Sequence, residues 1–283
     1  MTDLTIRNGA INLAASVHGP EGAPDVVFLH GISQSRDTWE ETVARLKDRY
    51  RCWTLDFRGH GHSDRAESYL INDYVSDAAA LLDMIGRSAI VIGHSLGGAV
   101  GAVLAQGPHR FIKAALLEDP PYYLAEPKEW ARGIYGAVFT AARERASALL
   151  AADSTFPQFV EAVRNAPAVQ GGKQGDHHAP RHIGSLASGM MRHDIESWAP
   201  VLSLDVFAAI DVTAPMRVPV TIIQADHHIA PAFMAGHEKR FIETSPDAKI
   251  IYFEGAPHRI HATKSCEARC LDIIEAFVET AAT

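Results

Sequence analysis

The sequence predicts an α/β protein with a mostly parallel, doubly wound sheet and a helical insertion. Short apolar segments alternate with helical segments between residues 25 and 119, and again from residue 218 to the end. Strands covered on both faces give such continuous apolar runs, and their alternation with helices indicates parallel strands joined by crossover helices. Between residues 120 and 213 the patterns are helical, which predicts an insertion into this α/β framework.

The expected elements follow from apolar periodicity and from terminators such as Gly107-Pro108, which ends a helix. The predicted strands are 4–7, 11–18, 25–29, 50–57, 88–93, 112–117, 218–224 and 248–253. The predicted helices are one that starts at Asp37 or Thr38, followed by 72–85, 96–106, 129–152, 156–165, 181–192, 232–244 and 264–280. We therefore expect a core of residues 1–119 and 214–283, and a helical cap of residues 120–213.

Bulk properties narrow the class of protein. The 283 residues can bury a large core, and 26 basic against 34 acidic residues give a net charge of -8. That charge disfavours nucleic acid or an anionic membrane as a partner. No apolar stretch approaches the roughly 20 residues of a membrane span, and we expect no secretory signal. The odd count of three cysteines, without a pairing pattern, favours reduced thiols in the cytoplasm. No pattern sets the oligomeric state.

One segment carries a catalytic signature. The apolar run 89–92 leads into Gly93-His94-Ser95-Leu96-Gly97, and a helix of small residues follows. A strand, a sharp turn and a helix in this order hold a serine hydroxyl out at a helix N-terminus, which favours developing negative charge. A Cβ at Gly93 or Gly97 would collide with the neighbouring strand and helix. Ser95 is thus a candidate nucleophile, the alternative being an incidental serine in a glycine-rich turn.

Four segments together resemble the α/β-hydrolase superfamily. They are Phe28-Leu-His-Gly-Ile32, Asp56-Phe-Arg-Gly-His-Gly-His-Ser63, Gly93-His-Ser-Leu-Gly-Gly98 and Gly255-Ala-Pro-His258. Their order and spacing match that superfamily along nearly the whole chain. The resemblance implies Ser95 as the nucleophile and His258 as its base, with His261 as the competing histidine. Pro257 departs from the pattern, because the superfamily more often has glycine there.

Acyl transfer also needs donors for the oxyanion. The backbone amide after the nucleophile belongs to Leu96, and we expect the second donor to be the amide of Ile32, next to Gly31. The alternative for His30-Gly31 is an ordinary tight turn.

The acid of the triad has two main candidates. Chain order places it between Ser95 and the histidine, either at the end of the strand 112–117 or after the strand 218–224. We prefer Glu118, because certain dehalogenases and lactonases of the superfamily carry a glutamate there. Asp226 is the alternative acid, although it falls two residues earlier than the superfamily's usual position, and Asp119 is a third.

The nucleophile and the histidines limit the chemistry. Dehalogenases and epoxide hydrolases of this fold need a carboxylate where Ser95 stands, so carbonyl chemistry remains. The segment His60-x-His62-x-Asp64 is followed by Arg65, where a metallo-β-lactamase signature needs histidine. His177-His178 and His227-His228 lack ligand spacing. We therefore expect no metal and no cofactor.

The sequence favours hydrolysis of a carboxylic ester or lactone of a small, fairly apolar molecule through an acyl-enzyme. The pocket candidates are apolar or aromatic: Trp39, Tyr122, Tyr123, Met190 and Met191. The segment Arg192-His193-Asp194 could bind a carboxylate, although solvated surface is the simpler interpretation. The alternative functions are hydrolysis of a carbon–carbon bond in a ring-cleavage product and a non-catalytic ligand receptor.

Overall fold

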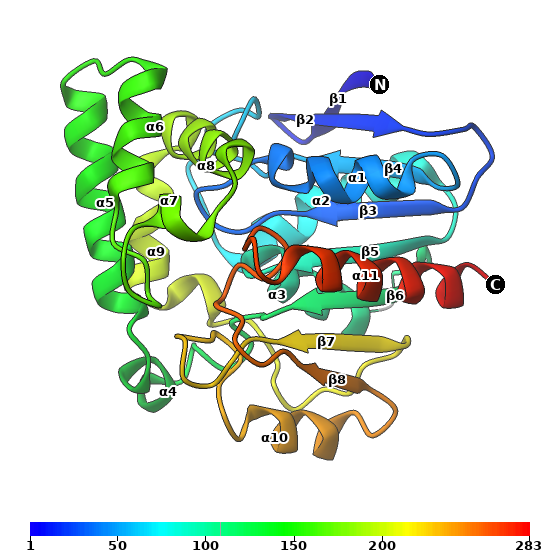
Figure 1. Ribbon diagram of the computed structural model, residues 1–283. Helices are drawn as coiled ribbons and strands as arrows, with labels where there is room; N and C mark the ends of the chain where they lie inside the picture. The colour runs from blue at the N-terminus through cyan, green and yellow to red at the C-terminus, as the bar shows by residue number, and fades with distance from the viewer. Residues whose placement is uncertain (108) are drawn as a thin grey trace.

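The computed structural model describes residues 1–107 and 109–283, so Pro108, which helped to predict a helix end, lies outside the described residues. The strands β1 to β8 form one sheet in the order β1-β2-β4-β3-β5-β6-β7-β8 (Figure 1). They are β1 (Thr2–Asn8), β2 (Ile11–His18), β3 (Asp25–Leu29), β4 (Arg51–Leu55), β5 (Ala89–His94), β6 (Ile112–Glu118), β7 (Val220–Gln224) and β8 (Lys249–Tyr252). β2 pairs antiparallel with both β1 and β4, and the remaining neighbours, β4-β3-β5-β6-β7-β8, all pair parallel.

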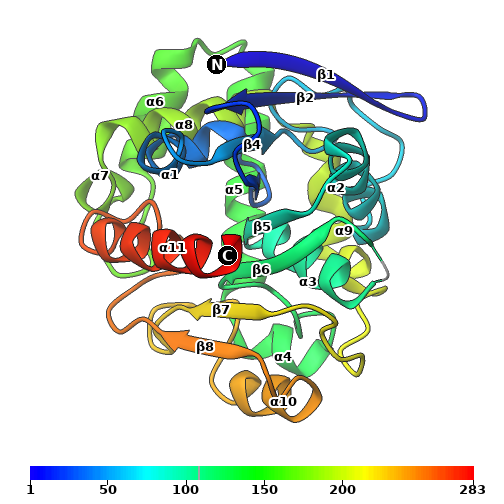
Figure 2. The same cartoon turned by 90° about the vertical axis from the view of Figure 1, so that its right-hand side faces the viewer.

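Helices cover both faces of the sheet. In Figure 2, α1 (Glu40–Leu46) and α11 (Glu267–Ala282) lie on one side, and α2 (Ile71–Ile85) and α3 (Leu96–Gln106) lie on the other. The 3-10 turn η1 (Arg36–Trp39) precedes α1, so that helix starts later than expected. This arrangement confirms the predicted doubly wound α/β fold.

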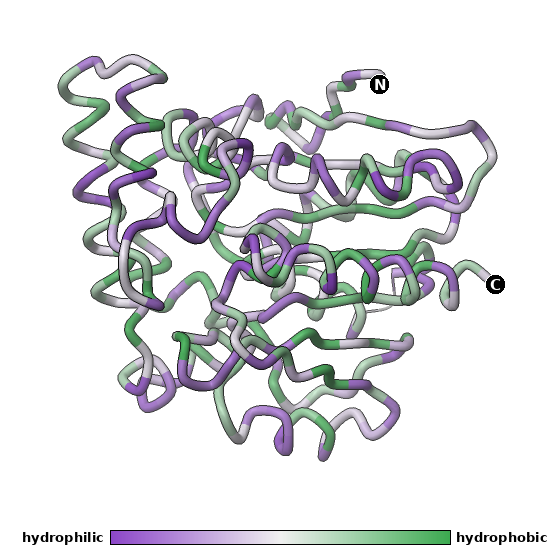
Figure 3. Tube along the Cα trace, viewed as in Figure 1, coloured by the Kyte–Doolittle hydropathy of each residue, from purple (hydrophilic) through white to green (hydrophobic). Residues whose placement is uncertain are grey.

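The sheet divides the core into two apolar clusters. Side chains alternate across each strand, so Val27 and Leu29 of β3 join one cluster while Val26 and Phe28 join the other. All four are fully buried, and Figure 3 shows hydrophobic colour concentrated along the central strands. Burying each such side chain contributes about 1.5–3 kcal/mol, which fixes strand register and hence the residues at the strand ends.

Between β6 and β7 the chain forms helices beside the carboxyl ends of the parallel strands (Figure 1). They are α4 (Pro127–Arg132), α5 (Tyr135–Ala151), α6 (Phe156–Asn165), α7 (Gln174–His177), α8 (Pro180–Arg192), η2 (Ile195–Ser197), α9 (Trp198–Leu202) and η3 (Asp205–Phe207). The helix expected over 129–152 is two helices, because the chain turns at Gly133. α6 and α8 share a small apolar cluster of their own. The boundaries of a separate cap stay a prediction.

The last helices start later than their apolar patterns suggest. α10 (His237–Thr244) begins five residues after Ala232, because the amides of Ala232 and Phe233 bind the carboxylate of Asp119 instead of continuing a helix. None of the helices that the structure describes combines the length and the apolar character needed to cross a membrane.

Candidate active site

Ser95 stands at the turn between β5 and α3. Its φ of 53° and ψ of -116° are a strained conformation for a residue with a side chain. Two backbone bonds hold the turn: the Ser95 amide donates to the Glu118 carbonyl at 3.0 Å, and the Gly97 amide donates to the His30 carbonyl at 3.0 Å. The strain is thus supported by the strands on either side, and the side chain stands at the N-terminus of α3.

The two glycines of this turn are required by close approach of the backbone. A Cβ on Gly93 would lie 2.2 Å from the carbonyl oxygen of Gly97, and one on Gly97 would lie 2.2 Å from that of Leu29. Neither backbone can retreat without breaking the turn that presents Ser95.

His258, in the loop after β8, is bonded to Asp119. The His258 Nδ1 lies 2.6 Å from the Asp119 Oδ2. The Asp119 side chain is fully buried and also accepts the amides of Ala232 at 2.7 Å and Phe233 at 3.0 Å. These bonds compensate the burial of a carboxylate and fix its direction toward the imidazole.

Glu118 does not contact His258, so the geometry expected for the preferred acid is wrong. Its carboxylate instead lies 2.8 Å from the Nδ1 of His261 and accepts the His261 amide at 3.0 Å. His261 Nε2 lies 2.9 Å from the hydroxyl of Thr38, and its ring stacks on Trp39 with centroids 4.5 Å apart. Two acid–histidine pairs therefore lie side by side, and the one that involves Asp119 faces the cavity.

Strand register explains this division. His94 pairs with Glu118 in the parallel ladder of β5 and β6, so Ser95 and Asp119 each come one residue later. Successive side chains of a strand point to opposite faces. Glu118 accordingly binds His261, while Asp119, at positive φ just beyond the end of β6, binds His258. His94 lies between the two histidines, with ring centroids 4.8 Å from His258 and 5.1 Å from His261.

Asp226, the alternative acid, is also not bonded to His258. Its carboxylate accepts the amides of His228 at 2.9 Å and Gly255 at 2.7 Å. These backbone hydrogen bonds hold the pKa of Asp226 below its usual range. Asp226 thus ties the loop after β7 to the loop that carries His258.

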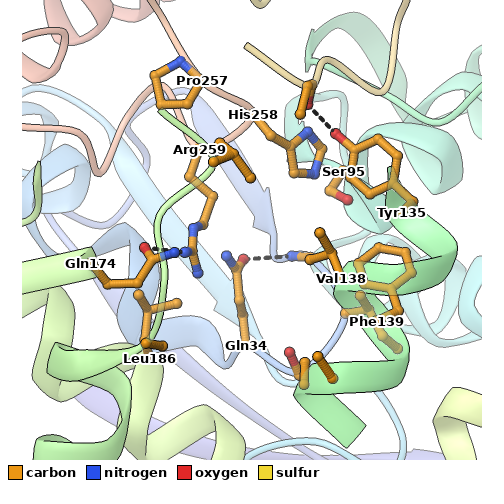
Figure 4. Close-up of a pocket in the computed structure, with 18 of the residues that line it drawn as sticks. Gln34, Ser95, Tyr135, Val138, Phe139, Gln174, Leu186, Pro257, His258 and Arg259 are labelled. Carbon is orange, nitrogen blue, oxygen red and sulfur yellow. Dashed lines mark hydrogen bonds between the residues drawn. The ribbon is translucent and has the colours of Figure 1, made fainter. Parts of the chain in front are cut away.

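A cavity of about 280 Å³ opens at Ser95 and His258. Figure 4 shows these two side chains at one end beside Tyr135, with Val138 and Phe139 next to them, and Arg259 extending toward Gln174 and Leu186 at the other end. Most of the lining is apolar and comes from the helices between β6 and β7: Ile134, Val138, Phe139, Leu186, Met190 and Trp198. A small adjoining cavity also reaches Ser95.

The two expected oxyanion donors lie beside this site. Leu96 is the first residue of α3, where backbone amides have no intrahelical partner, and it lines the small cavity with Ile32. The neighbouring amides already have acceptors: the Gly31 amide donates to Gln34 Oε1 at 2.9 Å, and the Ser33 amide donates to His60 Nε2 at 3.2 Å. Among the described residues the Ile32 amide has no such partner.

Several pocket expectations are corrected by the packing. Trp39, Tyr122, Tyr123 and Met191 line neither cavity, whereas Met190 lines the larger one. Trp39 is buried in the core beneath His261, and Tyr122 is buried with its hydroxyl 2.6 Å from the Gln106 side-chain nitrogen. Apolar character alone does not tell which face of the chain a side chain occupies.

Tyr123 and Met191 are held away by other contacts. The Arg240 guanidinium lies 4.0 Å from the centroid of the Tyr123 ring, and Met191 packs on the α6–α8 cluster. The segment 192–194 is not solvated surface throughout, because His193 and Asp194 are buried and Asp194 accepts the hydroxyl of Tyr69 at 2.7 Å.

The sequence reasoning missed Gln34, Gln174 and Arg259, which line the cavity, and it named Tyr135 only among the cap aromatic residues, of which some were expected to face the serine. Arg259 could have been found from its place directly after His258. The direction of the Tyr135 side chain could not be predicted, because this residue belongs to the middle of a helical pattern. Its hydroxyl donates to the Ala230 carbonyl at 2.5 Å.

No cluster of three or more histidine, cysteine, aspartate or glutamate side chains within residues 1–107 and 109–283 is arranged to hold a metal ion. His60 instead accepts the Ser33 amide at Nε2, and its Nδ1 lies 2.9 Å from the Arg58 carbonyl. Both ring nitrogens of His60 therefore make contacts within the protein, which gives this histidine a structural role in its loop.

Comparison with known proteins identifies the class. Residues 26–268 match the family model described as the alpha/beta hydrolase family, so the chain belongs to this family. Its relatives include hydrolases that act on esters and lactones. The chain is 36% identical over 96 residues to 3-oxoadipate enol-lactonase 1 of Acinetobacter baylyi, and 39% identical over 87 residues to 2-(acetamidomethylene)succinate hydrolase of Mesorhizobium japonicum.

Those matches are partial. They cover 34% and 30% of this chain, and 36% and 31% of the respective relatives. Solved structures match over the whole fold: an epoxide hydrolase from Vigna radiata has a TM-score of 0.75 at 20% identity, covering 99% of this chain and 98% of that one. The enol-lactonase from Burkholderia xenovorans has a TM-score of 0.68 at 18% identity, covering 98% and 100%. At these identities the structural likeness establishes the fold.

Proposed function

We propose that this protein is a serine hydrolase that cleaves a carboxylic ester or lactone of a small molecule with a largely apolar body. Ser95 is the nucleophile, His258 is the base and Asp119 is the acid. The observation that carries the proposal is the 2.6 Å bond between His258 and Asp119 at the cavity that Ser95 also lines. The relatives named as an enol-lactonase and as methyl ester esterases support this class of substrate.

The chemistry follows from these positions. A neutral hydroxyl is a weak nucleophile, so His258 Nε2 takes the Ser95 proton as Oγ attacks the carbonyl carbon. Asp119 holds the Nδ1–H and stabilises the charged imidazole. The amides of Leu96 and Ile32 bind the oxyanion, and each such donor is worth about 2.7–4 kcal/mol in the transition state.

The intermediate then collapses. The carbon–oxygen bond breaks, His258 returns its proton to the leaving alcohol, and an acyl-Ser95 ester remains. Water, deprotonated by the same histidine, attacks this ester and releases the acid. For a lactone the alcohol and the acid are two ends of one product.

A panel of esters and lactones tests the proposal. We expect multiple turnovers with the native protein and none with Ser95→Ala. Comparable rates in both would contradict the serine mechanism. A single burst with p-nitrophenyl acetate and no further turnover would instead indicate a ligand receptor. Exclusive turnover of a vinylogous 1,5-diketone, such as a ring-cleavage product, would indicate a carbon–carbon bond hydrolase.

A further inference from the structure

The cavity is positively charged. Among the described residues that line it, the side chains with a permanent charge are Arg145 and Arg259, and there is no aspartate or glutamate. This is the reverse of the whole chain, in which acidic residues outnumber basic ones and the net charge is -8. The positive charge is therefore a local property of the cavity rather than an average of the surface.

Arg259 is the cation nearest in sequence to the reacting groups. One of its guanidinium nitrogens donates to Gln174 Oε1 at 2.9 Å, and no carboxylate of the described residues lies within 4.0 Å of it. Burial lowers the pKa of Arg259 to about 10, so the group remains a cation at neutral pH. The side chain is half-buried where it lines the cavity, and a cation that is partly removed from water without a counter-charge costs free energy. A bound anion would offset that cost.

The other titratable groups around Arg259 do not supply that counter-charge. Burial lowers the pKa of His178 to about 3 and that of His94 well below the ordinary value. Burial raises the pKa of Tyr135 well above its ordinary value. All three side chains are therefore neutral at pH 7. The carboxylate of Asp119 is already bound to His258 and to two loop amides.

We propose that Arg259 binds an anionic group of the substrate, most simply a carboxylate, while Ser95 attacks the ester or lactone carbonyl of the same molecule. This inference rests on the serine-hydrolase function proposed above and specifies its substrate class. Gln174 accepts one N–H of the guanidinium and thereby directs the group, whose remaining N–H donors can form paired bonds to a carboxylate. The apolar side chains around it, such as Val138 and Phe139, contact the rest of the molecule.

The competing explanation is that Arg259 only links the loop after β8 to α7 through Gln174. Removing a link of that kind would disturb His258 and would slow every substrate alike. Recognition of an anion instead predicts a loss confined to anionic substrates. The two explanations are separated by comparing charged and neutral substrates of the same shape.

Two substrate pairs provide this comparison. The first places the charge on the acyl side: 4-nitrophenyl hydrogen glutarate against 4-nitrophenyl valerate. The second places it on the alcohol side: 4-carboxyphenyl acetate against 4-methylphenyl acetate. The variants are Arg259→Met, which keeps the aliphatic stem, Arg259→Lys, which keeps the charge, and Gln174→Leu, which keeps Arg259 but removes its bond to Gln174 together with the Gln174 bond to the Pro167 carbonyl. Arg7→Met, on the exposed edge strand β1, is the matched control for loss of one positive charge.

We expect the native protein to prefer the anionic member of at least one pair. Arg259→Met should lower kcat/KM for that member by about 10- to 150-fold, the value of a hydrogen bond to a charged group, and should change the neutral member much less. Arg259→Lys should recover part of the loss, and Arg7→Met should change neither. Glutarate should inhibit the native protein competitively and Arg259→Met more weakly.

Other outcomes overturn the inference. The inference fails if the native protein has equal kcat/KM for both members of each pair. It also fails if Arg259→Met lowers kcat/KM equally for the anionic and the neutral member. If neither member of either pair is turned over in a Ser95-dependent way, the proposed serine hydrolase function fails instead. Binding of glutarate to Ser95→Ala, measured by calorimetry, then still tests the anion site by itself.

Discussion

The Oδ2 of Asp119 lies 2.6 Å from the Nδ1 of His258, and this bond separates two adjacent acidic residues into different roles. Glu118, one residue earlier, binds both the ring and the backbone amide of His261. Because His258 and His261 belong to one loop, the Glu118–His261 pair anchors the loop while the Asp119–His258 pair faces the cavity. Asp226 holds the start of the same loop through Gly255.

Substitution of the three acids by their amides should separate these roles. Asp119→Asn should lower kcat by up to about 10⁴, because an amide favours the wrong histidine tautomer and cannot stabilise the imidazolium. Glu118→Gln and Asp226→Asn should lower kcat far less per folded molecule. Steady-state kinetics on samples checked by circular dichroism measure this order, and a larger loss in Glu118→Gln than in Asp119→Asn would contradict it.

The two histidines should differ in the same way. His258→Ala should lower kcat by about 10⁴ or more and leave the fold intact, because the side chain is partly exposed to the cavity. His261→Ala should leave the buried carboxylate of Glu118 with the backbone amide of residue 261 but without the imidazole, and should cost about 3–5 kcal/mol of stability. Kinetics and urea unfolding of both variants test this. A stable, inactive His261→Ala beside an active His258→Ala would reverse the assignment of the base.

Covalent labelling tests the nucleophile directly. A fluorophosphonate should form a stable adduct on Ser95, because the strained turn, the adjacent base and the amide donors activate this hydroxyl. Ser95→Ala should remain unlabelled while its thermal unfolding temperature stays near that of the native protein. Peptide mass spectrometry locates the adduct, and modification of any other serine in Ser95→Ala would contradict the assignment.

The sequence predicted the fold well, because buried strands leave apolar runs and the ends of helices are marked by capping residues and proline. The strand 25–29 and the helix 156–165 coincide with β3 and α6, since one is continuously apolar and the other is bounded by a capping threonine and by Pro167. The end of α10 was predictable, but its start was not. The amides of Ala232 and Phe233 bind Asp119, a residue more than a hundred positions away, and no local pattern contains that contact.

The acid of the site shows what one sequence leaves undetermined. Glu118 and Asp119 are adjacent carboxylates, and the choice between them depends on which face of β6 each side chain takes. The register of β5 against β6 carries that information, because Ser95 follows His94 as Asp119 follows Glu118. Register is a property of paired strands, and motif spacing along one strand does not report it. The orientations of Tyr122 and Tyr123, in the turn after β6, were missed because they depend on contacts with Gln106 and Arg240, which are distant in the sequence.

Chelation should leave the activity unchanged. The serine mechanism uses the amides of Leu96 and Ile32, rather than a metal ion, to stabilise the oxyanion. Incubation with EDTA followed by an ester assay, with zinc content measured by atomic absorption, tests this. Activity that disappears with removal of a stoichiometric metal and returns when it is added back would contradict the mechanism.

The carboxylate of Asp226 should make the stability of the protein depend on pH. Its pKa in the folded protein is held below the ordinary value of 3.8, first by the His228 amide and then by the Gly255 amide. A carboxyl group with a lowered folded pKa stabilises the fold fully above the unfolded value, and the contribution is lost as the pH falls through the folded value. Asp226→Asn lacks this titration and also turns an amide NH₂ toward one of the two N–H donors.

We therefore expect Asp226→Asn to be less stable than the native protein by about 1–3 kcal/mol at pH 7, with the difference shrinking as the pH falls below about 4. Urea unfolding followed by tryptophan fluorescence at pH 7, 5, 4 and 3 measures it. The exposed Asp247, changed to asparagine, is the matched control and should show little difference at any pH. A difference for Asp226→Asn that stays constant from pH 7 to pH 3 would mean that the two amide bonds do not favour the charged form.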